Sequence, residues 1–238
     1  MPTAILSERE PAGGPLTRIR LQVEEATAAT HKLHGQYIEL RYEGGWRGDE
    51  DATIPAAMKG IFVLASAPGE KTWDLLVKAG GAMADRLATS IPLGTKLPTS
   101  DAIGKGFPYD AAKGKPLVLA ATGSGIAAVL SAVGARIADG EAASTFVLYG
   151  VREKKDVSLS AELAAMRAKG VHVAVCLSRE HLHEEGFFKG YVQHVAAERG
   201  WKLEGGRVFA AGNKAMIEGI REAMPSLGLT REDVLLNF

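Results

Sequence analysis

Small and polar residues gather where an apolar run gives way to helical sequence, first at Thr122, Gly123, Ser124 and Gly125. Glycines at a strand-to-helix junction let the backbone approach a pyrophosphate closely, and the free N–H groups and positive dipole end of the helix face the anion. A turn with two glycines is weak support by itself, because many such junctions use glycine. The segment is therefore a candidate phosphate-binding turn that needs corroboration from its neighbours.

Comparable signals follow three later apolar runs. "LYGVREKKD" ends the second run, "CLSREH" ends the third and "FAAGNKAMI" ends the fourth. The carboxyl ends of parallel strands meet at one edge of an open sheet, and ligands bind at that edge. We therefore expect the four segments to form one nucleotide site.

The elements that must position these segments differ between the two parts of the chain. From residue 115 onward, runs rich in Val, Leu and Ala alternate with amphipathic stretches, which predicts a parallel sheet with helices on both faces. Residues 16–110 carry short apolar runs bounded by turn residues, together with one short helix near "AMADRLA", which predicts an antiparallel β-barrel. We divide the chain into a flexible tail at 1–15, a barrel domain at 16–110 and an α/β domain at 111–238.

Composition limits the classes of function. Lys and Arg number 28, as do Asp and Glu, so no global field attracts nucleic acid or a membrane surface. Cys176 is the only cysteine, which excludes an iron–sulfur cluster or a disulfide framework within this chain. No apolar run is long enough to span a membrane, and the first 15 residues do not resemble a secretory signal, so we expect a cytoplasmic protein.

Two further groups of residues are interpreted structurally. His181 and His183 stand beside two glutamates but lack a third histidine or cysteine at ligand spacing, so we expect a surface loop and no metal site. Trp46, in a turn-rich insert, and Trp73 are expected to pack in the barrel or to anchor loops, since no basic residues interleave with them as nucleic-acid binding would require.

The order of these motifs resembles the ferredoxin–NADP reductase family. "LAATGSGIAAVLS", "LYGVRE", "LSRE", "KGYVQ" and "FAAGNKAMI" are similar to the successive motifs of its NADP-binding half. "GQYIEL", "FVLASAP", "WDLLVKAGGAMADRLA" and "LPTSDAIGKGFPYD" are similar to its FAD-binding barrel. The resemblance covers Thr17 to Phe238 and implies a Greek-key FAD barrel followed by an NADP-binding α/β domain.

The resemblance implies NADP rather than NAD. Ser178 and Arg179 match the pair that contacts the 2′-phosphate, whereas an NAD site more often presents an acid to the ribose. Guanidinium, hydroxyl and lysine groups all suit a phosphate, although solvated charges at a strand end remain the alternative for Arg179 and Lys189. The implied NADP residues are Thr122, Gly123, Ser124, Gly125, Ser178, Arg179, Lys189, Tyr191, Gln193, Gly212 and Asn213.

The flavin motif departs from that of the family. Gly60 stands where the family has an arginine for the FAD pyrophosphate, and Val63 stands where it has a hydroxyl for the flavin N5 edge. Phe62 can still cover a ring face, and the loop before Ala84 can still offer N–H groups. The implied FAD residues are Phe62, Val63, Leu64, Ser66, Gly81, Ala82, Met83 and Ala84.

Catalytic positions are implied at Ala211, Gly212 and Phe238. Many relatives have Cys-Gly-Pro where this chain has Ala211, Gly212 and Asn213, so the thiol that helps to place the nicotinamide is absent. Because hydride transfer depends chiefly on geometry, this change implies slower or altered chemistry rather than none. Phe238 either stacks on the flavin as a gate for the nicotinamide or caps the core at the end of a final strand.

These expectations define a flavin-dependent oxidoreductase that passes hydride from NADPH to FAD and electrons to a separate acceptor. The acceptor would be a ferredoxin, another redox protein or a small molecule. One alternative is an NADP-binding regulatory protein that has lost its flavin, which Gly60, Val63 and Ala211 motivate. Another is an interaction subunit that docks to a larger redox complex.

Overall fold

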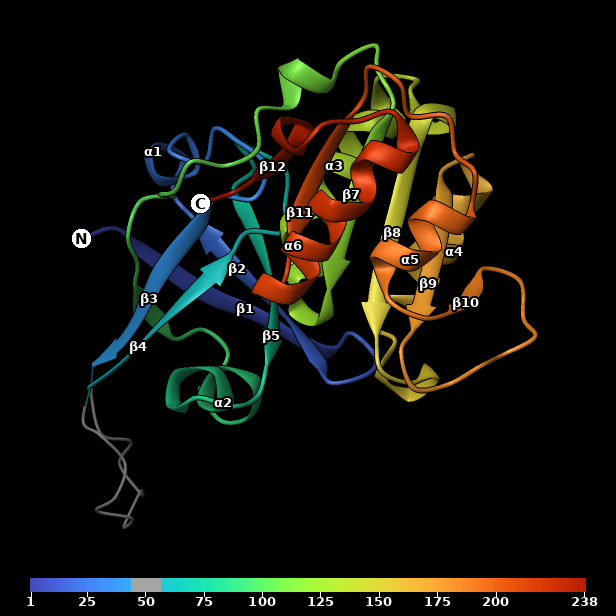
Figure 1. The fold of residues 1–238 in the computed structure, drawn as a ribbon. Coiled ribbons are helices and arrows are strands. Elements are labelled where there is room, and N and C mark those ends of the chain that lie inside the picture. Colours follow the sequence, from blue (N-terminus) through green and yellow to red (C-terminus); the bar gives the residue numbers. More distant parts are fainter. Residues whose placement is uncertain (44–56) are drawn as a thin grey trace.

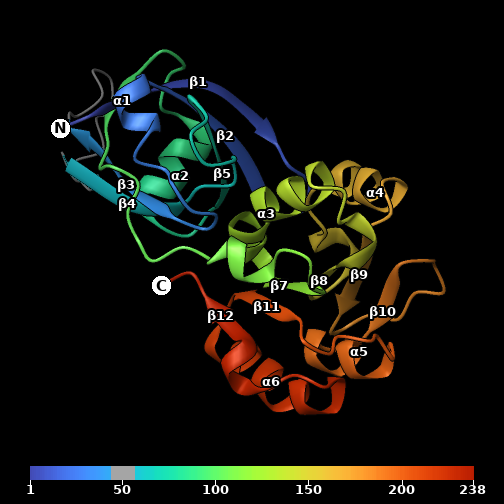
Figure 2. The same cartoon turned by 90° about the horizontal axis from the view of Figure 1, so that it is seen from above.

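The computed structural model describes residues 1–43 and 57–238, which form two domains side by side (Figures 1 and 2). Trp46 and almost all of the turn-rich insert around it lie outside the described residues. Among the described residues, no helix combines the length and the apolar character needed to cross a membrane.

The N-terminal domain consists of antiparallel strands. Its strands and helices are β1 (Thr3–Pro11), β2 (Leu16–Val23), α1 (Glu25–Ala28), β3 (Tyr37–Glu43), β4 (Ala57–Val63), β5 (Thr72–Lys78), α2 (Ala82–Thr89), β6 (Lys96–Pro98) and η1 (Tyr109–Ala112). One sheet has the order β5-β2-β1-β6, and β3 pairs with β4 in a second sheet. Isolated bridges from Leu64 to Leu75 and from Leu40 to Thr99 join the two sheets at both sides. The strands thus close into a ring, which confirms the predicted antiparallel barrel.

The expectation of a flexible tail at residues 1–15 is wrong. These residues contain β1, which pairs with both β2 and β6, and the side chains of Ala4 and Leu6 are fully buried. Charged residues in "SEREP" hid this strand from the sequence pattern. In the structure Glu8 and Glu10 face outward and pair with Arg20 and Arg18 of β2, whereas Arg9 donates to the Leu87 carbonyl of α2.

The C-terminal domain is built on a parallel sheet with the order β10-β9-β8-β7-β11-β12. Its elements are β7 (Leu117–Thr122), η2 (Gly123–Gly125), α3 (Ile126–Ala138), η3 (Ala142–Ser144), β8 (Thr145–Val151), η4 (Lys154–Asp156), α4 (Ser160–Ala168), β9 (His172–Leu177), β10 (Phe187–Lys189), α5 (Val192–Glu198), β11 (Arg207–Ala211), α6 (Lys214–Ala223), η5 (Met224–Leu227), η6 (Arg231–Asp233) and β12 (Val234–Leu236).

Alternate side chains of the central strands point to opposite faces of the sheet and pack into two separate hydrophobic cores. Leu117 and Leu119 of β7 pack with the apolar residues of α3 and α4, whereas Val118 and Ala120 pack with those of α5 and α6. Figure 2 shows the two helix pairs on opposite faces of the sheet. This arrangement, which the continuous apolar runs required, confirms the predicted α/β domain.

The tip of the β1–β2 hairpin fastens the barrel to the second domain. The Leu159 amide donates to the Ala12 carbonyl at 2.7 Å, and the Ser158 hydroxyl donates to the Gly13 carbonyl at 2.6 Å. Arg18 of β2 forms an ion pair with Glu162 of α4. We call these contacts the hairpin clamp.

A second set of contacts joins the domains elsewhere. His34 Nδ1 lies 2.9 Å from the Ser131 hydroxyl of α3, and the rings of Phe107 and Phe209 stack with their centroids 4.6 Å apart. The Asn237 side-chain amide donates to the Gly35 carbonyl at 2.8 Å. The two domains are thus joined at two places, whereas the boundary between residues 110 and 111 stays a prediction.

Two buried histidines of the barrel should make stability depend on pH. Burial is the main cause that lowers the pKa of His31 and His34 to about 4. Because the unfolded chain binds protons near its ordinary pKa of about 6.5, the stability that these neutral rings contribute is present above that value and is lost as pH falls toward 4. We expect the unfolding free energy of the wild type to fall, relative to that of His31→Leu, by about 2 kcal/mol from pH 7 to pH 4.

Urea unfolding at several pH values measures this difference. His194→Leu, at an exposed position on α5, is the matched control and should follow the wild type at every pH. A gap between the wild type and His31→Leu that stays constant from pH 7 to pH 4 would contradict the assignment.

Candidate active site

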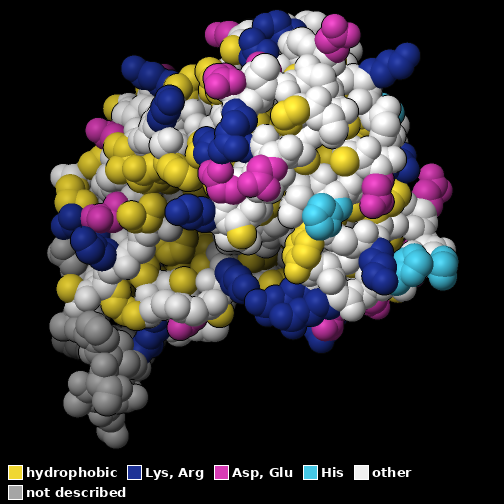
Figure 3. Space-filling view, viewed as in Figure 1, with side chains coloured by type: hydrophobic (Ala, Val, Ile, Leu, Met, Phe, Trp, Pro, Cys, Tyr) yellow, Lys and Arg dark blue, Asp and Glu magenta, His cyan; other side chains and the backbone are white. Residues whose placement is uncertain are grey.

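The carboxyl ends of the parallel strands form one polar edge of the α/β domain. Figure 3 shows Lys and Arg side chains together at this lower edge, beside the apolar surface of the barrel. The predicted segments after β7, β8, β9 and β11 all reach it, because these strands run parallel and in register.

The glycine turn packs tightly against the end of β11. A Cβ atom on Gly125 would lie 2.9 Å from the Ala211 carbonyl carbon and closer still to its oxygen, so Gly125 permits the close approach of α3 to this strand. Gly123 has a φ of +54°, a conformation that favours glycine. No side chain caps η2 or the helix that follows it, and the Ile126 amide already donates to the Gly123 carbonyl, so the N–H groups left for a ligand are those at the start of η2. This geometry suits a phosphate ligand.

Two arginines lie side by side at the same edge. The Ser178 amide donates to the Val151 carbonyl at 3.1 Å, and the Arg179 amide donates to the Arg152 carbonyl at 2.9 Å. The segments after β8 and β9 therefore run together beyond the ends of their strands. The pKa of Glu153 is lowered chiefly by Lys155, with further contributions from Arg179 and Arg152, so both guanidinium groups act on that carboxylate. Arg152 was missed as a site residue, although it follows β8 directly in "LYGVRE".

The remaining NADP candidates divide into two groups. Lys189 pairs with Leu177 in the sheet, beside Ser178, and Tyr191 is 57% exposed at the start of α5. The structure thus brings these two residues to the polar edge. Gln193 packs instead against Gly219 of α6, and its buried Oε1 atom lacks a hydrogen-bond partner in the described structure.

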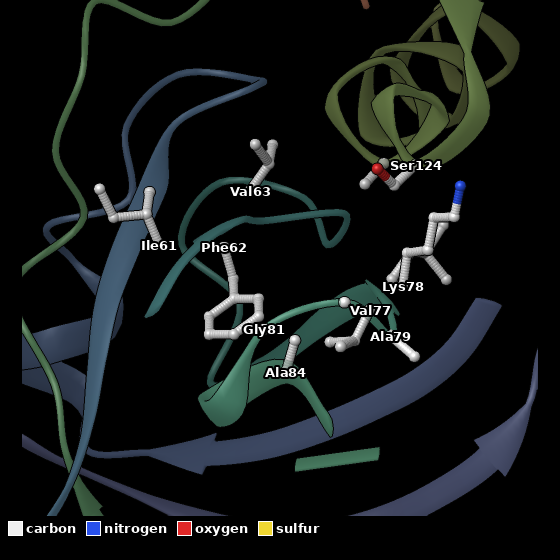
Figure 4. Close-up of a pocket in the computed structure, with 12 residues that line it drawn as sticks. Ile61, Phe62, Val63, Val77, Lys78, Ala79, Gly81, Ala84 and Ser124 are labelled. Atoms are coloured by element: carbon white, nitrogen blue, oxygen red, sulfur yellow. The ribbon is translucent and has the colours of Figure 1, made fainter. Parts of the chain in front are cut away.

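A cavity of about 370 Å³ lies between the barrel and the glycine turn (Figure 4). The residues that line it are Ile61, Phe62, Val63, Leu76, Val77, Lys78, Ala79, Gly80, Gly81, Ala84, Ser124 and Ala127. A second cavity of about 280 Å³ lies beside it, where Ala82 and Met83 join the lining. Lys78 was missed, because a lysine at the end of a strand ordinarily indicates only a solvated charge.

Two of the predicted FAD residues do not face these cavities. Leu64 is fully buried in the barrel core. Ser66 is also buried, and its hydroxyl accepts a hydrogen bond from the Asp74 amide at 3.3 Å. Both residues belong to the support of the cavity wall.

The start of α2 offers an anion-binding backbone. Its N-cap residue is Gly81, and no side chain caps the first turn. Gly80 and Gly81 have open space where a side chain would begin. Because Gly81, Ala82 and Met83 line the second cavity, unpaired N–H groups of this turn are available to a phosphate.

The candidate catalytic residues occupy different surroundings. Ala211 is buried at the end of β11, whereas Gly212 is exposed beside Thr122. Asn213 serves as the N-cap of α6, since its side-chain oxygen accepts a hydrogen bond from the Met216 amide at 2.9 Å. Phe238 is 69% exposed, and the described residues that line the cavities do not include it.

His181 and His183 of the surface loop lie close to each other. The rings of His181 and His183 lie with their centroids 4.5 Å apart. Within residues 1–43 and 57–238, no three His, Cys, Asp or Glu side chains form a group that could hold a metal ion.

Sequence comparison relates this arrangement to known proteins. The family model described as the oxidoreductase NAD-binding domain matches residues 119–222. Ferredoxin–NADP reductase B of Sorangium cellulosum is 32% identical over 190 residues, which cover 74% of this chain and 76% of that protein. The chain belongs to the ferredoxin–NADP reductase family. Its class of activity is that of an NAD(P)H-dependent flavin oxidoreductase.

Solved structures extend the likeness of this ferredoxin–NADP reductase family member to the whole fold. A ferredoxin–NADP reductase from Neisseria gonorrhoeae, with bound FAD and NADP, has a TM-score of 0.77 at 16% identity, over 98% of this chain and 96% of that one. A cytochrome P450 reductase from Amycolatopsis has a TM-score of 0.81 at 20% identity, over 99% of this chain and 68% of that one. At these identities the likeness concerns the fold.

Proposed function

We propose that this chain passes hydride from NADPH to a flavin and then delivers electrons to a separate acceptor. The acceptor is a redox protein of the ferredoxin type or a small molecule. The observation that carries the proposal is the cavity bounded by Phe62, the first turn of α2 and Ser124, next to the edge that holds Arg152 and Arg179. We assign flavin binding to the barrel at residues 1–110 and NADPH binding to residues 111–238, in the cytoplasm.

The chain's own residues fit these two ligands in different ways. Phe62 lines both cavities and offers a ring face, and the uncapped first turn of α2 offers N–H groups to the pyrophosphate of FAD. The glycine turn at residues 122–125 binds the NADPH pyrophosphate, and Arg179 with Arg152 binds the 2′-phosphate. A flavin bound there accepts a hydride and returns electrons singly or in pairs.

Close packing of the two domains sets the geometry of the transfer. Ser124 and Ala127 of the α/β domain line the same cavity as Phe62 and Val63 of the barrel. The nicotinamide and the flavin ring can therefore meet without a side-chain acid, because hydride transfer needs alignment of the reacting atoms. Gly212, after the end of β11, lets the chain pass close to Thr122 at the start of the glycine turn.

NADPH oxidation by the purified chain tests the proposal. With added FAD and ferricyanide as an artificial acceptor, we expect NADPH to be consumed and ferricyanide to be reduced. A matched reaction without protein measures the background. Failure to oxidise NADPH at saturating FAD, FMN and riboflavin would contradict the proposed function and would favour a regulatory role.

A further inference from the structure

The two cavities of the flavin site are almost free of charge. Of the described residues that line them, only Lys59 and Lys78 carry charged side chains. The residues common to both linings are Ile61, Phe62, Gly81 and Ala84, which are all neutral and form a shared floor. Within the described lining, a cationic contact to a flavin phosphate therefore has to come from one of these two lysines.

Neither lysine is directed toward this floor. Lys59 is 72% exposed at its side chain and lies 3.7 Å from a Glu39 carboxylate oxygen. The amino group of Lys78 points toward Ser124 of the glycine turn and away from Phe62 (Figure 4). Lys78 thus belongs to the side of the cavity that faces NADPH.

Gly60 lies directly against the Phe62 ring. A Cβ atom on Gly60 would lie 2.7 Å from Cε2 of Phe62 and 3.3 Å from Cβ of Met83. The Phe62 ring therefore fills the space in which any side chain at residue 60 would begin. A side chain at residue 60 would require the ring to move, so glycine at residue 60 and the neutral, aromatic floor belong together.

Such a floor discriminates poorly between flavins. Riboflavin, FMN and FAD share the isoalloxazine ring, which an aromatic face binds equally in all three. A charge-assisted contact to phosphate would add about tenfold to a hundredfold in affinity for FMN and FAD alone. Without it, only the N–H groups at the start of α2 favour the phosphorylated flavins, and exposed helix ends contribute modestly.

We propose that this chain uses its flavin as an exchangeable co-substrate, binding riboflavin, FMN and FAD through the shared ring and releasing the reduced flavin. NADPH gives up a hydride and leaves as NADP⁺, while the flavin takes up that hydride and one proton from solvent and leaves as dihydroflavin. The two electrons then travel on the diffusing dihydroflavin to its oxidant, an electron-accepting protein or dioxygen. This inference rests on the proposed function, because it names the substrate class of the same site.

Equilibrium binding of three flavins to the full chain, after removal of any flavin by dialysis, tests the inference. We expect the dissociation constants for riboflavin, FMN and FAD, measured by quenching of flavin fluorescence, to agree within about tenfold, or about 1.4 kcal/mol. FAD that binds more than about tenfold tighter than riboflavin, or that stays with the protein through dialysis, would overturn the inference.

Two matched variants keep the test specific to the ring. Phe62→Leu should weaken the binding of all three flavins by a common factor of about three to ten, since each loses the same aromatic contact. Phe188→Leu, at a partly buried phenylalanine of the α/β domain, should leave all three unchanged. Unaltered flavin binding in Phe62→Leu would contradict the assigned floor.

The two proposals fail in different ways. Turnover of NADPH with a tightly held FAD would leave the proposed function standing and overturn the exchangeable flavin. Equal binding of the three flavins without any oxidation of NADPH would support the ring-based site and contradict the reductase activity.

Discussion

Arg179→Ala is expected to weaken NADPH binding by about tenfold to a hundredfold, while NADH binding changes by less than about threefold. The reason is that only NADPH carries the 2′-phosphate that the paired arginines are placed to bind, and a charge-assisted contact contributes most of such a difference. Fluorescence titration of the full chain with each nucleotide measures both constants.

Arg231→Ala is the matched control for this prediction. Arg231 lies in η6 before β12, at the opposite end of the parallel sheet, where it pairs with Glu218. Its removal should leave both nucleotides unaffected. Equal losses of NADPH and NADH in Arg179→Ala would refute the assignment of a 2′-phosphate site.

Gly125→Ala and Gly134→Ala should change the free energy of unfolding in opposite directions. Both add one methyl group to α3, at its N-cap in the first variant and in its interior in the second. The methyl group on Gly125 would overlap the Ala211 carbonyl, so we expect a loss of about 3 kcal/mol in unfolding free energy together with strongly weakened NADPH binding. Gly134 lies exposed in α3 with open space around it, so alanine there should add about 0.5–1 kcal/mol.

Urea unfolding measures both changes, and NADPH titration of each variant follows the site. Gly134→Ala should bind NADPH as the wild type does, which separates an effect on the turn from a general effect of helix propensity. A Gly125→Ala variant as stable as the wild type would show that α3 and β11 do not pack as closely as the structure has them.

The nucleotide edge could be predicted from the sequence because its signals are local and periodic. Each apolar run from residue 115 onward had to be a buried parallel strand, and the residue type after each run indicated which end carries polar groups. Gly125 follows directly from that pattern, whereas the role expected of Arg179 came from the resemblance to the family. Arg152 carried the same signal and was overlooked.

Long-range contacts explain what the sequence did not reveal. The outward charges of β1 become interpretable only once β2 supplies their partners, and the role of Asn213 as a helix cap depends on the exact start of α6. The overlap of Phe62 with residue 60 depends on the direction of one aromatic side chain. Residue order alone specifies neither a rotamer nor a pairing between distant strands.

The hairpin clamp has a consequence for how ligands reach the site. Leu16 of β2 and Leu76 of β5 are buried in the hydrophobic core that the barrel shares with α3 and α4, so these two strands help to build the neighbouring domain. A hinge motion between the domains would have to break both the hairpin clamp and the contact between His34 and Ser131 before the cavity could widen. We therefore expect the two domains to keep their relative positions while nicotinamide and flavin enter and leave the cavity between them. Their rates of entry and release should depend on side-chain motion at the opening of that cavity rather than on domain opening.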